Sequence, residues 1–83
     1  MNAKTFLHTF PDGTKAEARY HINTGGKLGG IVATTAAIGN RVFIHPTAQV
    51  GPDAVIEEFG FIEDRVTIGK SARVGSGSTI KEN

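Results

Sequence analysis

Aliphatic side chains recur at every sixth position in the C-terminal part of the chain. The register runs without a miss through Val32, Ile38, Ile44, Val50, Ile56, Ile62, Ile68, Val74 and Ile80. An α-helix would need a period of 3.6 residues and a single β-strand a period of 2, so neither element explains a period of six. The pattern instead predicts a chain that forms a short strand and then turns a corner every six residues.

Small and turn-forming residues occupy the positions between these aliphatic residues. The fourth residue after each aliphatic is mostly small: Ala36, Val42, Ala48, Ala54, Gly60, Val66, Ala72 and Ser78. Pairs such as Pro52-Asp53 and Ser76-Gly77 precede some of these positions, and such residues adopt turn conformations at little cost. Each hexapeptide is therefore predicted to point its aliphatic residue inward and to bend at the small residue.

This pattern resembles the hexapeptide-repeat family, most closely in Val50-Gly51-Pro52-Asp53-Ala54 and Ile68-Gly69-Lys70-Ser71-Ala72. The resemblance covers residues 32–83 and implies an all-β fold, a left-handed parallel β-helix of triangular section with fewer than three coils. The left hand comes from the resemblance, not from the periodicity. Such a motif is typical of a fold and does not identify one function.

Three hexapeptides make one coil, so residues 18 apart should lie above one another. The predicted internal columns are Val32-Val50-Ile68, Ile38-Ile56-Val74 and Ile44-Ile62-Ile80. The same spacing predicts that Phe43 and Phe61 stack on the outer surface about one strand spacing, ~4.8 Å, apart. Exposed stacked phenylalanines require a covering partner, which is either a second subunit or the chain's own N-terminal segment.

So short a stack is marginally stable by itself, because the few buried aliphatic residues must offset the ordering of the whole backbone. Self-association is the expected remedy. Members of the family usually form homotrimers, so the resemblance implies a homotrimer. Its predicted binding or subunit contact contains Phe43, Phe61 and Lys81.

The N-terminal residues follow a different pattern. Residues 1–24 are predicted to form a β-hairpin, with a turn at Pro11-Asp12-Gly13 between two alternating strands. A lone hairpin is marginal in water, so we expect it to cap an end or cover a face of the β-helix, on its own subunit or on a neighbour. Residues 25–31 form a Gly-rich connection whose four glycines indicate flexibility, with a hinge or close-packing role.

Composition narrows the class of protein. The 83 residues suffice for a single core, cysteine is absent, and the net charge of +1 argues against a nucleic-acid partner. No apolar run approaches the ~20 residues of a membrane span, and residues 1–10 lack the layout of a signal peptide. We therefore expect a cytoplasmic protein without a membrane partner. Of the three histidines, only His45 lies in the repeat, so no metal site is expected.

One constellation suggests chemistry. His45, Glu63 and Lys81 lie 18 residues apart and should form an outward ladder. A carboxylate can orient a histidine that acts as a general base. Many hexapeptide-repeat proteins are acyltransferases that bind coenzyme A between subunits, which would make His45 and Glu63 catalytic and coenzyme A the acyl donor. Such enzymes are longer, however, and the ladder is also explained as solvated cross-strand pairing.

The leading hypothesis is therefore a small non-catalytic binding or structural module, with an unknown small-molecule ligand and no cofactor. The alternative is a minimal acyltransferase-like protein with a histidine base in the groove between subunits.

Overall fold

The computed structural model describes residues 4–82, which form eleven β-strands and no helix. Three longer strands come first: β1 (Phe6–Thr9), β2 (Lys15–Ile22) and β3 (Leu28–Ala33). Eight two-residue strands follow at six-residue spacing: β4 (Ala37–Ile38), β5 (Phe43–Ile44), β6 (Gln49–Val50), β7 (Val55–Ile56), β8 (Phe61–Ile62), β9 (Thr67–Ile68), β10 (Arg73–Val74) and β11 (Thr79–Ile80).

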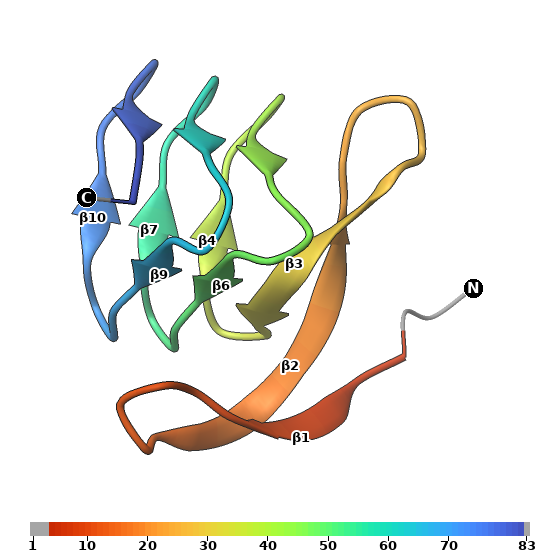
Figure 1. Cartoon of the computed structure of the whole chain (residues 1–83), viewed down its shortest axis with the longest axis vertical. Helices are drawn as coiled ribbons and strands as arrows, with labels where there is room; N and C mark the ends of the chain where they lie inside the picture. The colour runs from red at the N-terminus through yellow and green to blue at the C-terminus, as the bar shows by residue number, and fades with distance from the viewer. Residues whose placement is uncertain (1–3, 83) are drawn as a thin grey trace.

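The short strands enter three sheets in rotation (Figure 1). β6 and β9 extend the sheet of β1, β2 and β3, while β4, β7 and β10 form a second sheet and β5, β8 and β11 a third. Val32 pairs in parallel with Val50, Ile38 with Ile56 and Ile44 with Ile62, and each column continues one coil further. The predicted stacking of residues 18 apart is thus confirmed.

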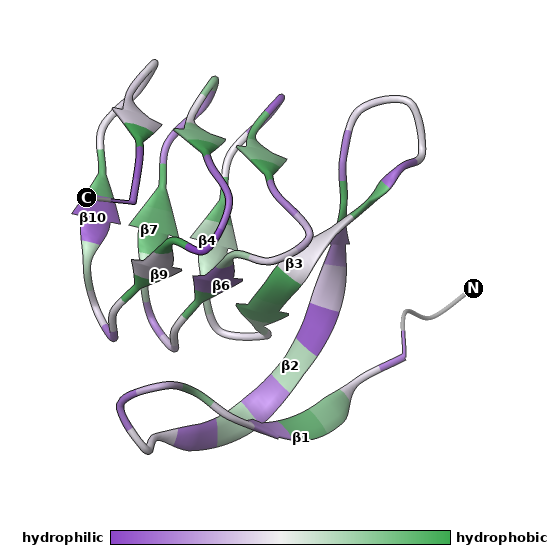
Figure 2. Ribbon diagram, in the orientation of Figure 1, coloured by the Kyte–Doolittle hydropathy of each residue, from purple (hydrophilic) through white to green (hydrophobic). Residues whose placement is uncertain are grey.

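The core lies inside these three sheets. Val32, Ile44, Val50, Ile56 and Ile62 are its largest fully buried side chains. In Figure 2 the hydrophobic segments of the short strands alternate with polar or neutral corners, as the six-residue register predicts. Alternating hydrophobic and hydrophilic bands also mark β2, whose two faces have different surroundings.

The corners hold residues with left-handed backbone. Five non-glycine residues have φ between 57° and 64°: Arg41, Asp53, Phe59, Arg65 and Ser71. Two equivalent corners carry Thr35 and Thr47, whose branched Cβ disfavours that region, and their Oγ1 atoms instead accept hydrogen bonds from the next coil. Some corners thus continue the stack with left-handed backbone, and others connect successive coils through a threonine hydroxyl.

The prediction of a flexible connection at residues 25–31 is wrong for residues 28–31, because Leu28, Gly29, Gly30 and Ile31 belong to β3. Only the turn before them joins β2 to β3, and Asn23 N donates to Lys27 O at 2.7 Å across it. Gly29 and Gly30 are buried, and a Cβ on Gly30 would lie 2.1 Å from the carbonyl oxygen of Ala48. Close packing, and not a hinge, explains these two glycines.

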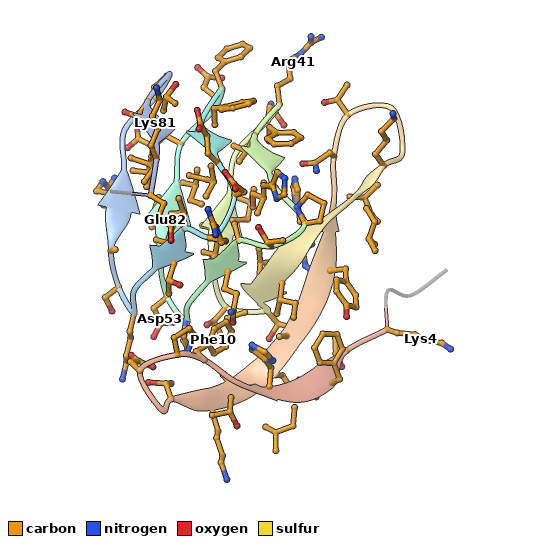
Figure 3. The ribbon with its side chains drawn as sticks, viewed as in Figure 1. Lys4, Phe10, Arg41, Asp53, Lys81 and Glu82 are labelled. Atoms are coloured by element: carbon orange, nitrogen blue, oxygen red, sulfur yellow. The ribbon has the colours of Figure 1, made fainter. Side chains whose placement is uncertain are left out.

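The predicted hairpin packs on its own chain. β2 pairs antiparallel with β3 and thereby covers one edge of that sheet. A second small core contains Phe10, Ala18 and Ala33, and His8 Nε2 lies 2.7 Å from Gln49 Oε1. The hairpin therefore both caps an edge and folds over the outer face beside β6, and Figure 3 shows Phe10 beneath the stack.

Asn23 closes a second edge. Its side chain is buried, with Nδ2 donating to Ile44 O at 2.9 Å and Oδ1 accepting from Ile44 N at 2.9 Å. These two bonds reproduce what a neighbouring strand would offer to β5, the terminal strand of its sheet. The asparagine amide therefore satisfies the free edge of β5 without another strand.

Candidate functional site

The outer face of the β5–β8–β11 sheet carries the residues singled out in the sequence. Its outward side chains, half-buried or exposed, flank the inward isoleucines in two columns, Phe43, Phe61 and Thr79 on one side and His45, Glu63 and Lys81 on the other. The rings of Phe43 and Phe61 stack with centroids 4.7 Å apart and an interplanar angle of 19°. The predicted aromatic pair is therefore present, and we call it the aromatic face.

The N-terminal hairpin does not cover the aromatic face. Phe61 remains 42% exposed, although the hairpin is folded onto the sheet that contains β6. Of the two coverings considered from the sequence, the chain's own N-terminal segment is therefore not the one observed for its described residues, 4–24.

Phe59 extends the apolar surface, and sequence reasoning missed it. It lies at the corner between β7 and β8 and is 55% exposed. Arg41 occupies the same corner 18 residues earlier, one coil before it. An aromatic residue in a corner column otherwise filled by arginine and glycine was the available signal. Exposed aromatic side chains therefore occur both on the face and at the adjoining corner.

The structure does not join His45 to Glu63. Thr47 N donates to His45 Nδ1 at 3.1 Å, and Thr47 Oγ1 lies 2.9 Å from the same nitrogen. That Oγ1 also accepts from Arg65 N of the next coil at 2.8 Å. Within residues 4–82 no hydrogen bond or ion pair links His45 with Glu63. His45 thus organises a corner, and the carboxylate that would orient a general base is not in place.

A shallow depression of about 490 Å³ adjoins the Phe59 corner. Asn40, Glu57, Glu58 and Ser76 supply its polar lining. Glu57 also accepts a hydrogen bond from Arg73 Nη2 at 3.3 Å, an ion pair between exposed side chains. Glu58 is exposed and makes no ion pair among the residues that the structure describes. The depression is therefore acidic, with Glu58 as its unneutralised carboxylate.

The surroundings of His21 shift its pKa. Its Nε2 donates to Val42 O at 3.0 Å. Burial lowers the pKa below the ordinary 6.5, the Val42 carbonyl acts in the opposite direction, and nearby Arg19 lowers it further. The neutral ring is therefore the form that the fold prefers.

We expect this preference to make stability depend on pH. Below about pH 6.5 the unfolded chain binds a proton at His21 that the folded chain resists, so stability is lost as the pH falls. Urea unfolding at pH 7.5 and pH 5 should show a larger loss for the wild type than for His21→Gln, which keeps an amide donor but does not titrate. An equal loss in both proteins would contradict the assignment.

No group of three metal-ligating side chains comes together in the described part of the chain. No helix within residues 4–82 is long and apolar enough to cross a membrane.

The site therefore consists of an exposed aromatic face, an aromatic corner and an acidic depression, without an assembled catalytic dyad. No protein-family model, curated protein or solved structure matches the chain. Its function has to be inferred from these residues and their arrangement.

Proposed function

We propose that this chain is a left-handed parallel β-helix of the hexapeptide-repeat type, acting as a non-catalytic binding or structural module that assembles as a homotrimer. Two parallel three-stranded sheets, the parallel β3–β6–β9 part of the third sheet and the register of 18 residues support the helix. The left hand and the trimer come from the family resemblance of residues 32–83. The aromatic face is the proposed contact between subunits.

The observation that carries the proposal is the outward-facing stack of half-buried Phe43 and exposed Phe61. Two aromatic rings held parallel on a rigid sheet form an apolar surface, and such surfaces mark sites of interaction. Burying it against another subunit would add apolar burial that the short core lacks. Lys81 lies on the same face and would provide a charged contact at its rim.

Phe61→Glu tests this contact. Losing one buried phenylalanine and placing a carboxylate in the contact should raise the dissociation constant about a hundredfold. Sedimentation velocity should find a trimer for the wild type and a monomer for the variant at the same micromolar concentration. Because Phe61 is exposed in the isolated chain, circular dichroism should show that the variant still folds. A wild-type monomer would contradict the proposal.

The same samples separate the module from the acyltransferase alternative. A non-catalytic module should keep its melting temperature when acetyl-coenzyme A is added. A clear upward shift that is lost in His45→Ala would instead support acyl-donor binding and a role for His45.

A further inference from the structure

Phe59 combines an exposed aromatic side chain with the left-handed backbone of a corner. Its φ is 64°, a left-handed value that is an outlier for a bulky side chain, and its ring is 55% exposed. The equivalent residue one coil later is Gly77, which adopts φ 73° without that cost. The same corner position is left-handed at Arg41, Asp53, Arg65 and Ser71, so the conformation belongs to the repeat, and the exposed aromatic side chain is what distinguishes this corner. The corner therefore offers an aromatic ring at the surface.

The surroundings of Phe59 complement those of Phe61. Beside Phe59 lies the acidic depression with Glu58. Phe61 pairs with Thr79 on β11, and Lys81 lies exposed two residues further along the chain, in the column of His45 and Glu63. The corner thus carries a ring and a carboxylate, and the face carries two rings and an ammonium group. Figure 3 shows Lys81, and Arg41 of the same corner column as Phe59, at the same upper side of the stack.

We infer that the aromatic face of one copy packs against the Phe59 corner of a second copy, with Lys81 of the first entering the acidic depression of the second. This inference rests on the proposed function, because it requires self-association through the aromatic face. It adds the receiving surface. The contact is heterologous, meaning that each copy contributes a different patch to each interface.

The placement of the two patches sets the size of the assembly. In a three-sided stack, a face and the adjoining corner point in directions a sixth of a turn apart. When two stacks pack side by side with parallel axes, the face of one points directly at the corner of the other. The rotation that relates the two copies is then half a turn minus a sixth of a turn, which is a third of a turn. A heterologous contact with that rotation closes after three copies. The face and corner thus favour a closed trimer over an open filament.

Two variants that each damage one patch test the inference. Phe59→Glu lacks a working corner and Phe61→Glu lacks a working face, so each should be monomeric alone. When the two variants are mixed in equal amounts, the intact face of Phe59→Glu can still pack against the intact corner of Phe61→Glu. Native mass spectrometry, well above the concentration at which the wild type assembles, should therefore detect a dimer of one copy of each.

The outcomes are distinguishable. If Phe59→Glu still forms a trimer while Phe61→Glu does not, the corner is not the receiving surface, and the inference fails while the proposed function stands. If both variants are monomeric but never pair, the contact is not heterologous and the inference also fails. A monomeric wild type removes both. Ile22→Glu is the matched control, because Ile22 is 57% exposed on β2 and its variant should still form the trimer.

A folding defect is excluded by Phe59→Gly. Glycine relieves the left-handed conformation, so this variant should melt no lower than Phe59→Glu. It should nevertheless lose the trimer, because the ring is gone. A trimer that survives Phe59→Gly would overturn the inference.

Charge reversal checks the second half of the contact. Glu58→Lys and Lys81→Glu should each weaken assembly about tenfold, because like charges then meet across the contact. The double variant should recover most of this loss, since every interface regains an opposite pair. If the assembly of the double variant is weakened by the product of the two single losses, the placement of Lys81 is wrong.

Discussion

Replacing Gly30 with alanine should lower the free energy of unfolding by about 3 kcal/mol or more, among the largest effects of a single core substitution. The added Cβ would lie 2.1 Å from Ala48 O and 2.7 Å from His45 O. Both are backbone atoms next to β5 and β6, so no side-chain rotation can relieve the overlap. β3 would have to move away from the stack. Urea unfolding followed by circular dichroism measures the loss.

Gly69→Ala is the matched control for Gly30→Ala. Gly69 has no positive φ, and no atom lies within 4 Å of the Cβ that the substitution adds. Its free energy of unfolding should therefore stay within about 0.5 kcal/mol of the wild type. Similar midpoints for the two variants would mean that β3 does not pack against the chain around Ala48 as closely as the structure describes.

Asn23→Ala should cost about 3 kcal/mol, because it leaves both polar backbone groups of Ile44 without a partner. Ile44 is fully buried, and each buried group without a hydrogen bond costs about 1–3 kcal/mol. The loss should appear as a lower urea midpoint with an almost unchanged slope. Asn40→Ala, at an exposed corner position, should change stability by less than about 0.5 kcal/mol.

Asn23→Asp refines the test. The carboxylate still accepts from Ile44 N but cannot donate to Ile44 O, and it places a charge beside that carbonyl. Its stability should therefore recover as the pH falls and the aspartate becomes protonated. Stability of Asn23→Ala equal to the wild type would mean that water replaces the amide at the edge of β5.

Much of the fold follows from one repeated pattern. The six-residue period identifies which aliphatic side chains point inward, and the 18-residue spacing identifies which residues lie above one another. Both are local rules applied many times, so single exceptions do not disturb them. The Phe43–Phe61 stack follows from the same rule, because a residue next to a buried aliphatic must point outward.

The sequence predicted the candidate site less completely than it predicted the fold. His45 and Glu63 occupy the expected columns, yet His45 bonds with Thr47 two residues away instead of with the next coil. The position of a residue in its column predicts only where its side chain leaves the backbone. Its rotamer and its hydrogen-bond partner depend on the corner that follows, and a nearby hydroxyl is an easier partner than a carboxylate on another coil.

By itself, the sequence determined the stacking register, the inward column of aliphatic residues and the exposed aromatic pair, because all three result from periodicity. Only the tertiary structure decided that Gly29 and Gly30 form a packed strand, that Asn23 closes the edge of β5, and that Phe59 stands exposed on a left-handed corner. The first two depend on contacts between segments distant in the chain, and the exposure of Phe59 depends on what packs beside its corner, although its left-handed angle recurs at the same position of other repeats. Non-local packing therefore decided how the stack ends and which surfaces it presents.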